Sequence, residues 1–516
     1  MQSLTSTLAR ALGFSPFAWI RDTRRMRHLV SDFRQPPSPK PEAIHFAVII
    51  TPWMGTAVPW FSLACGLFLA SRGNRIAFVI DDMPFGDRPL RFRFVVRCVR
   101  SVLRLLPEQY EVIRLGDCVA ETPLSVAAQR SVDRLAQLNA VWALRGEMST
   151  DGRRRYTERA IRQLGTSYGA IADVFRSGRY DAVFVPGGVW GSSGIWTEQA
   201  REAGVRLASF DSGGYGTLML AADGVACQLQ DIPRALSLLK AHAASPEQRA
   251  FIAASAQAEM DRRRSGTDRF ASQMKNAAQL DARFSGAVLI ALNSSWDSAA
   301  LGLHAVFESS SEWIVETVRF LLDNTSAPVV VRQHPAERLE IARTSDDYRA
   351  LLTRHFANHP RLHFIAADEP VNSYDVLEQV AAVVVYTSTI GIEAAVHGKA
   401  VVTASRSYYS DLGFVRQATN LEQYRQYLSE AAHGLHPVTP PMREDALSCY
   451  YLTQCCNWVF SPFNPEGFTE WSRLDLAQLE QHEKVRVTVT SLEQNIPVAF
   501  LNHLALAEHQ RRLSVP

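Results

Sequence analysis

The sequence predicts an α/β protein built from two doubly wound halves that face a central cleft. Runs of apolar, β-branched residues alternate with helical segments twice along the chain, which is the pattern of parallel sheets covered by helices. Polar residues follow most of these runs, at the sheet edge where open α/β sheets bind ligands. The length of 516 residues exceeds one compact core and suits two domains.

The composition narrows the class of protein. Hydrophobic residues make up 47% and charged residues 21%, as in a soluble globular chain. A formal net charge of +2 argues against a dedicated nucleic-acid binder. The seven cysteines are scattered without a CxxC spacing, which indicates a reducing cytosol and neither a disulfide framework nor a zinc site.

Residues 1–40 are interpreted as a basic amphipathic leader followed by a linker. Arginines alternate there with Leu, Phe and Trp, and no apolar core precedes a signal-peptide cleavage site. One interpretation is a segment that lies on an acidic membrane surface. The other is a solvated leader or a helix packed on the domain. No stretch reaches the roughly 18 apolar residues that a spanning helix needs.

The first Rossmann-like domain is predicted over residues 41–245. "IHFAVIITP" and "GNRIAFVIDD" have the continuous apolar character of strands buried on both faces, with a helix between them at 60–71. "YDAVFVPGG" and "VRLASFDSGG" continue the sheet, and long helices are expected from Ser131 and from Arg153. "PGGVWGSSG" is interpreted as a flexible, Gly-rich loop of the kind that closes over ligands.

The rest of the chain repeats the alternation after a break. Residues 246–284 turn polar and charged and are interpreted as a helical crossing between the domains. A second Rossmann-like domain, over 285–436, contains the strands "GAVLIALNSS", "APVVVRQHP", "RLHFIAADEP", "AAVVVYTST" and "AVVTA" with helices between them. Residues 437–516 form a helical tail that we expect to pack back against the first half.

Three strand ends of the second domain carry polar groups that should converge. Because parallel strands end at one edge of a sheet, these side chains are expected to share a site. Pro335 prevents the strand "APVVVRQHP" from continuing. The candidates are Asn293 and Ser294, Arg332 and His334, and Thr387, Ser388 and Thr389.

The last of these strands runs into a helix that begins near Thr389. The first N–H groups of a helix lack partners and favour an anion, so the hydroxyls there can cap the helix or bind a phosphate. Gly391 has no Cβ and allows close approach of a ligand or of neighbouring backbone. Glu393, one turn later, can compensate the helix dipole or accept hydrogen bonds from ribose hydroxyls; Ile390 rules out a capping box.

The first domain offers fewer candidates. Gly55 and Thr56 lie in the turn after the first strand, where a substrate could approach the backbone closely, although the dinucleotide pattern GxGxxG is absent. Asp81, Asp82 and Asp211 each follow a strand and are candidate general bases, with turn formation as the alternative role of each.

With these residues assembled, the second half resembles bacterial capsule polysaccharide biosynthesis proteins. The resemblance covers about residues 286–414, and more weakly the first strand–helix–strand unit. It rests on "NSSWDSAALG", "VVRQHPAE", "PVNSYDVLEQVAAVVVYTSTIGIEAAVHGKAVV" and "SYYSDLGF". Members of this family are GT-B-type glycosyltransferases, related to the capsule transferases that use CMP-Kdo.

The resemblance implies a nucleotide-sugar donor, CMP- or UDP-linked, held by the second domain, with a polysaccharide or glycolipid acceptor held by the first. His334 and the Ser388–Thr389 turn would hold the donor phosphate and Glu393 the ribose. Asp411 stands where family members carry a basic residue, so the neutralising charge is expected from Arg332, Arg406 or the helix start.

The predicted function is therefore a metal-independent glycosyltransferase of the cytoplasm or the inner membrane surface. Metal independence is expected because no DxD triplet lies near a strand end, and no cofactor is expected. His334, Asp82 and Asp211 are the candidate catalytic residues. Two alternatives remain open: a nucleotide-sugar 2-epimerase on the same fold, which needs carboxylates facing the sugar from both domains, and a non-catalytic component of polysaccharide assembly.

Overall fold

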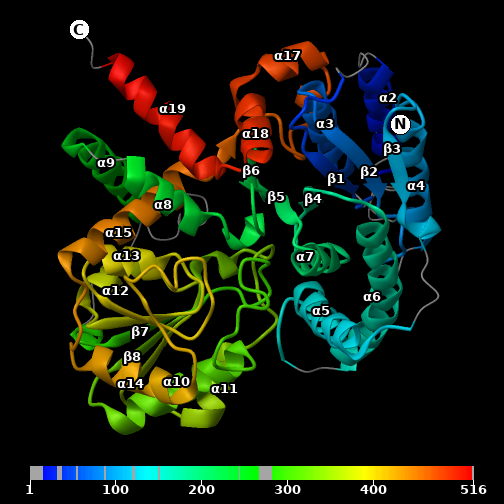
Figure 1. The fold of residues 1–516 in the computed structure, drawn as a ribbon. Helices are drawn as coiled ribbons and strands as arrows, with labels where there is room; N and C mark the ends of the chain where they lie inside the picture. The colour runs from blue at the N-terminus through cyan, green and yellow to red at the C-terminus, as the bar shows by residue number, and fades with distance from the viewer. Residues whose placement is uncertain are drawn as a thin grey trace. The chain divides into compact units, whose positions relative to one another are not determined.

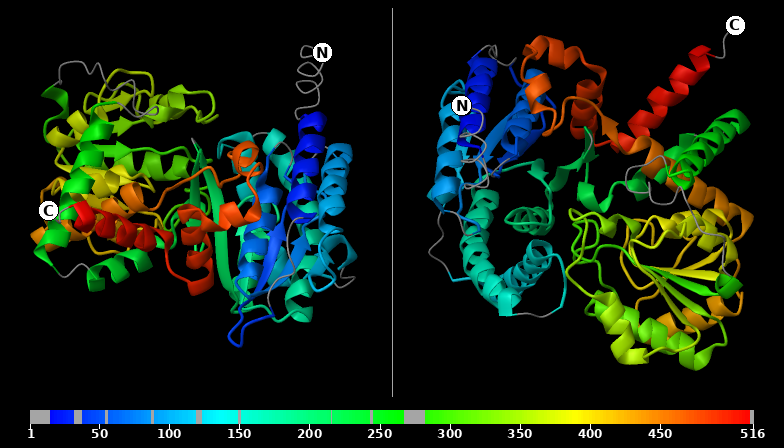
Figure 2. Two further views of the ribbon diagram at one scale, coloured as in Figure 1. Left: turned by 90° about the horizontal axis from the view of Figure 1, so that it is seen from above. Right: turned by 180° about the vertical axis from the view of Figure 1, so that it is seen from behind.

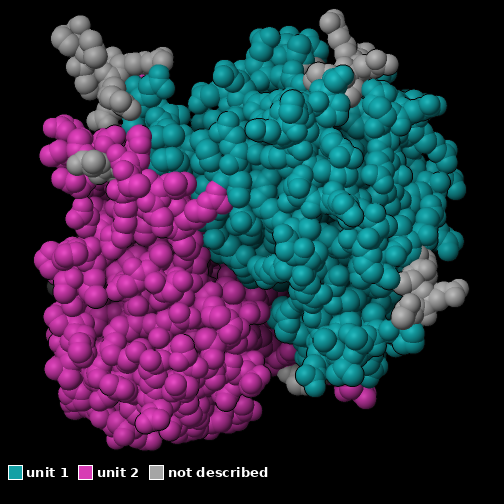
Figure 3. All heavy atoms as spheres, viewed as in Figure 1, with its two compact units in different colours: residues 1–139, 155–231, 457–508 teal, residues 140–154, 232–456, 509–516 magenta. Residues whose placement is uncertain are grey.

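The computed structural model describes residues 15–31, 38–53, 56–86, 89–118, 123–148, 151–214, 216–242, 245–266 and 282–513. These residues form two compact units (Figure 3). Unit 1 comprises 1–139, 155–231 and 457–508, and unit 2 comprises 140–154, 232–456 and 509–516. The stretch expected to cross between the domains thus falls in unit 2, and the expected tail is divided between the units after residue 456.

Unit 1 contains a sheet with the strand order β13-β6-β5-β4-β1-β2-β3 among its described residues. The pairs from β3 through β5 are parallel, whereas β6 pairs antiparallel with both β5 and β13. The strands are β1 (His45–Ile50), β2 (Arg75–Ile80), β3 (Glu111–Arg114), β4 (Ala182–Pro186), β5 (Arg206–Gly214), β6 (Thr217–Ala221) and β13 (Val459–Phe460).

Helices cover this sheet because its central strands are buried on both faces. The helices that belong wholly or mostly to unit 1 are for the most part labelled in Figure 1. They are α2 (Pro16–Ser31), α3 (Val58–Ser71), α4 (Pro89–Leu103), α5 (Val126–Leu144), α6 (Asp151–Ser177), α7 (Ser193–Glu202), α16 (Phe468–Trp471), α17 (Leu476–Gln481), α18 (Glu483–Gln494) and α19 (Val498–Leu513). The helix predicted at 60–71 begins two residues earlier, with Pro59 in its first turn, where its missing N–H costs no hydrogen bond.

Unit 2 contains an all-parallel sheet in the order β12-β11-β10-β7-β8-β9. The order reverses at β7, because β8 lies on one side of it and β10 on the other. The strands are β7 (Val288–Ala291), β8 (Val329–Arg332), β9 (Leu362–Ile365), β10 (Ala382–Val385), β11 (Ala400–Thr403) and β12 (Arg416–Gln417).

The helices of unit 2 lie on both faces of that sheet, with α10, α11 and α14 on one side and α12, α13 and α15 on the other (Figure 1). They are α8 (Ile232–His242), α9 (Pro246–Arg264), α10 (Ser310–Asn324), α11 (Tyr348–Phe356), α12 (Ser373–Gln379), α13 (Ile390–Val396), α14 (Leu421–Ala432) and α15 (Pro440–Tyr451). The predicted α/β class with two doubly wound, Rossmann-like domains is confirmed; the GT-B-like arrangement of the domains around a cleft stays a prediction.

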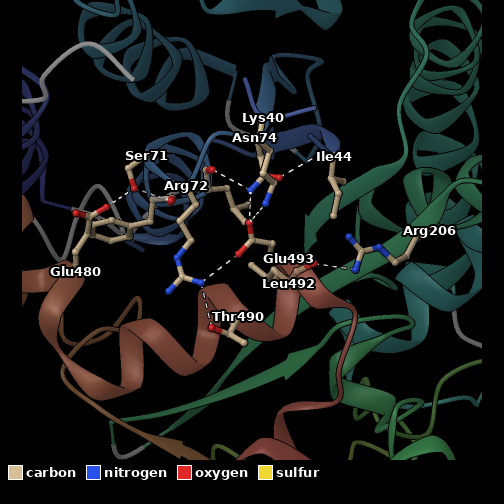
Figure 4. Close-up of polar contacts among 12 residues, drawn as sticks. Lys40, Ile44, Ser71, Arg72, Asn74, Arg206, Glu480, Thr490, Leu492 and Glu493 are labelled. Atoms are coloured by element: carbon tan, nitrogen blue, oxygen red, sulfur yellow. Dashed lines mark hydrogen bonds and ion pairs between the residues drawn. The ribbon is translucent and has the colours of Figure 1, made fainter. Parts of the chain in front are cut away.

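The C-terminal segment returns to unit 1, as expected for the tail. β13 extends the sheet beside β6, and α18 packs near α3. Figure 4 shows that Glu493, on the last turn of α18, accepts hydrogen bonds from Arg72 (3.2 Å), Asn74 (3.1 Å) and Lys40. Burial raises the pKa of Glu493, but the bonds from Lys40, Asn74 and Arg72 outweigh it and hold the pKa below the ordinary value.

Glu493→Ala should therefore destabilise unit 1 by about 2 kcal/mol, the typical worth of hydrogen bonds to a charged group. Because the pKa of Glu493 is lowered by folding, this contribution is present above the unfolded-state pKa of glutamate and disappears as pH falls through the folded-state value. Urea unfolding at neutral and acid pH measures both effects. Glu483→Ala, on the same helix with a side chain 69% exposed, should change little; equal losses in both variants would contradict the assignment.

Candidate functional site

The candidate site is a cavity of about 440 Å³ in unit 2, within the size range of small-molecule sites. It opens at the carboxyl ends of β7, β8 and β10, where the strand order reverses and open α/β sheets bind their ligands. Its polar and charged lining residues are Arg263, Asn293, Ser294, Asp297, Arg332, His334, Ser373, Tyr374, Thr387, Ser388, Thr389 and Glu393.

Most residues proposed from the sequence for this domain are therefore brought together. Asn293 and Ser294 follow β7, His334 follows β8, and the hydroxyl run follows β10. The Asn293 Oδ1 atom accepts the backbone N–H of Thr387 (3.4 Å), which links the ends of β7 and β10 directly. The Ser294 hydroxyl lies 3.1 Å from Glu337 and 3.2 Å from the carbonyl of Ala342, so it supports the wall of the cavity.

The hydroxyl run is a partly exposed part of the lining. Thr387, Ser388 and Thr389 are half-buried, and among the described residues their hydroxyls form no hydrogen bond. Thr389 occupies the N-cap position of α13 without a side-chain cap. The carbonyl of Ser388 is fixed by the Tyr409 hydroxyl (2.7 Å). The backbone of the run is thus held in place while its hydroxyls remain available to a ligand.

Gly391 has a different role from the one expected. It does not line the cavity, and a Cβ at this position would lie 2.9 Å from the Tyr409 hydroxyl and 3.0 Å from Val385. The absence of a side chain therefore allows the first turn of α13 to pack against Tyr409, and the close approach concerns a neighbouring side chain and not a ligand.

His334 presents a neutral imidazole to the cavity. Its Nδ1 accepts the backbone N–H of Ala336 (3.2 Å), so the ring proton sits on Nε2, which can donate to a bound group. Burial lowers the pKa of His334 to about 4, and the positive charges of Arg332 and Arg263 lower it in the same direction. At neutral pH, His334 is a hydrogen-bond donor and not a cation.

Arg332 is less available than the sequence suggested. It is buried, and its guanidinium donates to the carbonyl oxygens of Val371 (3.2 Å) and Ala366. These bonds hold the loop between β9 and α12 against β8. Arg406 is exposed and does not line the cavity. Arg332 thus lines the cavity with part of its guanidinium already engaged by backbone, whereas Arg406 lies outside it.

Arg263, the last residue but one of α9, supplies the positive charge that sequence reasoning missed. Its guanidinium donates to Glu259 (3.1 Å) and to Gln454. Burial lowers the pKa of Arg263, but the negative charge of Glu393 and other neighbours raises it overall, so it stays charged. A signal was present in the sequence: Ile252, Ala256 and Met260 form the buried stripe of α9, and Arg263 continues it three residues later.

Glu393 lies inside the cavity wall with 3% of its surface exposed. It accepts a hydrogen bond from the Tyr374 hydroxyl (3.1 Å). Burial raises the pKa of Glu393, and the charge of Arg263 and the hydrogen bond from Tyr374 act against this rise. The cavity thus combines a buried acceptor, Glu393, with an adjacent guanidinium and a row of hydroxyl donors.

The candidates of the first domain lie in unit 1. Asp82 accepts from Arg114 (2.8 Å) and from the N–H of Gly116 (2.8 Å), so its carboxylate is already fully engaged. Asp211 lies inside β5 and not after it, because β5 runs on to Gly214 by pairing antiparallel with β6. Thr56 is exposed, and its hydroxyl contacts the carbonyl of Trp53 (3.4 Å). Gly55 lies outside the described residues.

Asp81, by contrast, is a buried carboxyl group with a raised pKa. It is buried, and it accepts from the Ser192 hydroxyl (2.5 Å) and the Trp196 Nε1–H (3.1 Å). Burial raises its pKa to about 6, in spite of these two bonds. The Gly-rich loop that carries Ser192 is anchored, because the N–H of Gly191 also donates to Asn139 (2.7 Å).

Comparison with known proteins supports the family resemblance that the sequence predicted for the second half of the chain. Residues 234–435 match the family model described as "Capsule polysaccharide biosynthesis protein", which confirms the resemblance over that part of the chain. No curated protein matches the sequence.

Two of the similar solved structures are of KpsC from Thermosulfurimonas dismutans. The β-Kdo 2,4-transferase structure is 16% identical and aligns over 52% of this chain and 87% of that one, with a TM-score of 0.32. The β-Kdo 2,7-transferase structure is also 16% identical and aligns over 60% of this chain and 87% of that one, with a TM-score of 0.30. A third is the S. aureus MnaA–UDP co-structure, with 12% identity over 78% of this chain and 91% of that one and a TM-score of 0.27.

The environment of His334 predicts an acid-sensitive contribution to stability. Its pKa is about 4 when folded and about 6.5 when unfolded, so the unfolded chain binds a proton that the folded chain does not as pH falls from 6.5 towards 4. This contribution is thus complete above pH 6.5 and is lost below it. His334→Asn should make the melting temperature less dependent on pH across this window, because Asn can still accept the N–H of Ala336.

His436→Asn is the matched control, since the His436 side chain is 65% exposed and Asn tolerates its left-handed backbone, with φ at 58°. Melting curves of the three proteins between pH 4.5 and 7.5 give the comparison. An unchanged pH dependence in His334→Asn would contradict the neutral, desolvated imidazole.

Proposed function

We propose that this chain is a glycosyltransferase that moves a sugar from a nucleotide-activated donor to a capsule or other surface polysaccharide, or to its lipid-linked acceptor. The observation that carries the proposal is one cavity in which the free hydroxyls of Thr387, Ser388 and Thr389 occur together with Arg263 and Glu393. The capsule-family match over residues 234–435 supports the same conclusion, because it includes the whole lining of this cavity.

The donor we propose is a CMP- or UDP-linked sugar. Its anionic phosphate linkage would bind the hydroxyl run, the Nε2–H of His334 and the guanidinium of Arg263, all of which are hydrogen-bond donors. The two ribose hydroxyls would donate to Glu393, whose buried carboxylate is a strong acceptor. A sugar nucleotide has this combination of an anionic linkage and a vicinal diol.

The proposed reaction is displacement at the anomeric carbon. An acceptor hydroxyl forms the new glycosidic bond, the bond from the anomeric carbon to the phosphate oxygen breaks, and the nucleotide leaves with the electron pair. Donors aimed at that oxygen stabilise the charge that develops on it, which lowers the barrier. We assign this neutralisation to Arg263, His334 and the hydroxyls, and so propose that the reaction needs no metal and no cofactor.

The acceptor would be activated in unit 1, where Asp81 is the most suitable of the three candidate bases. Its pKa of about 6 lies close to working pH, as proton abstraction requires. As part of the same proposal, the protein works in the cytoplasm and contacts the inner face of the membrane through its N-terminal segment, where a lipid-linked acceptor would be found.

The first test is a thermal-shift and calorimetry panel of CMP, UDP, GDP and their sugars. A ligand that binds only the folded protein raises its melting temperature, and we expect this for a cytidine or uridine nucleotide. Arg263→Gln should weaken nucleotide binding about 10- to 100-fold, the loss expected for one charge-assisted hydrogen bond. Glu393→Gln should weaken binding of the nucleotide but not of inorganic pyrophosphate, which has no ribose.

Arg264→Gln is the matched control for the first of these variants. Arg264 is adjacent to Arg263 but pairs with Asp375 (2.9 Å) and Glu378, with a side chain 43% exposed, and it does not line the cavity. Equal losses in Arg263→Gln and Arg264→Gln, or no shift with any nucleotide, would overturn the proposed site.

The second test separates transfer from epimerisation. With the donor identified by the panel, a transferase releases the nucleotide only when an acceptor such as a glycolipid extract is added, whereas a 2-epimerase changes the sugar without one. We expect acceptor-dependent release, reduced about 10²- to 10³-fold in His334→Ala, as for loss of one transition-state donor. Conversion of the donor sugar in the absence of acceptor would instead establish the epimerase.

A further inference from the structure

Two helices of unit 1 lie side by side on the same core. α2 and α4 contact each other, and Figures 1 and 2 show them as neighbours in each view. The inner face of α2 includes Trp19, whose ring lies 5.5 Å from Trp60 of α3. The inner face of α4 includes Val95 and Val99, which belong to the same hydrophobic core. Both outer faces therefore point away from that core.

The outer faces combine arginines with large apolar side chains. On α2, Phe17 is 55% and Ile20 39% exposed, and on α4 Leu90 is 77% exposed. The exposed arginines of α2, and of α4 with the turn after it, are Arg21, Arg24, Arg27, Arg93, Arg97 and Arg104. Along α2 the exposed positions recur every three or four residues, so they form one stripe.

The charge of this surface is unbalanced. Residues 15–31 and 89–105 hold nine arginines and a single acid, Asp22, although the whole chain has a net charge of only +2. Asp22 is paired with Arg21 (2.8 Å). No acid of the described residues forms an ion pair with Arg24, Arg27, Arg93, Arg97 or Arg104. The positive charge is thus concentrated on two adjacent helices.

We propose that the outer faces of α2 and α4 together form a docking surface for a bilayer of anionic phospholipids. Arginines attract acidic headgroups, and the exposed Phe17, Ile20 and Leu90 can enter the boundary between headgroups and acyl chains. A nucleic-acid site would use the arginines but gain little from exposed apolar side chains. None of the described helices is long and apolar enough to cross a membrane, so the contact is at the surface.

This inference extends the proposed membrane contact, which the sequence assigned to the N-terminal segment alone. α4 contributes as much as α2, and it supplies a part of the surface that the amphipathic pattern of residues 1–40 does not contain. The surface belongs to unit 1, and none of its residues lines the cavity of unit 2. Docking and nucleotide binding can therefore be tested separately.

The test is sedimentation of the full chain with vesicles of phosphatidylcholine containing about one third phosphatidylglycerol. We expect binding to these vesicles, release at high salt and no binding to pure phosphatidylcholine. Arg93→Glu/Arg97→Glu should weaken vesicle binding at least tenfold. Leu90→Ser should make the bound protein easier to release with salt, because it removes apolar contact without changing the charge.

Arg155→Glu/Arg162→Glu is the matched control, with the same change of charge at two exposed arginines of α6. It should bind vesicles as the wild type does. Equal weakening by the control, wild-type binding to pure phosphatidylcholine, no binding to the anionic vesicles, or displacement of the protein from vesicles by duplex DNA would each overturn the proposal.

Two cross-checks keep this result distinct from the transferase proposal. Arg93→Glu/Arg97→Glu should keep the wild-type melting temperature and nucleotide affinity, and Arg263→Gln should keep wild-type vesicle binding. Loss of vesicle binding in Arg263→Gln would show that docking depends on the cavity and would contradict a separate surface.

Discussion

The site depends on one geometric constraint, which is that parallel strands deliver all their carboxyl ends to the same edge of a sheet. In unit 2 this edge collects three loops, because β7 stands between β8 and β10 and the connections leave in opposite directions on its two sides. The hydrogen bond that the Asn293 side chain accepts from the N–H of Thr387 links the ends of β7 and β10. Each residue proposed to bind the nucleotide-sugar donor lies at this edge or on a helix of unit 2.

The charges in the cavity are costly to bury and are arranged to support one another. Arg263 is flanked by Glu259 and by Glu393, and the Tyr374 hydroxyl donates to the second of these carboxylates. A buried group of this kind contributes little to stability compared with an apolar core, and removing one member leaves the others uncompensated. Its value lies in pre-organisation, since the donors and the acceptor are already oriented before a ligand arrives.

Much of this could be predicted from the sequence, and the reasons for the failures are physical. The apolar runs gave the central strands correctly because strands buried on both faces leave a continuous signal. His334 and residues 387–389 could be predicted to lie in one cavity because they follow such strands closely, and Glu393 because it lies in the helix that the last of these strands runs into. Asp211 was misplaced because the antiparallel partner that lengthens β5 cannot be recognised locally. The engagement of Arg332 and the presence of Arg263 in the cavity could not be predicted. The partners of these two residues, the carbonyl of Val371 and the carboxylate of Glu259, depend on tertiary packing.

The return of the chain to unit 1 after residue 456 has a consequence for biosynthesis. β6 lacks its neighbour β13, and Lys40, Arg72 and Asn74 lack Glu493, until the ribosome has also translated residues 232–456 of unit 2. Unit 1 can therefore be completed only after most of unit 2 has been synthesised, and until then the edge of β6 lacks its strand partner, which leaves unpaired backbone groups at that edge of the sheet.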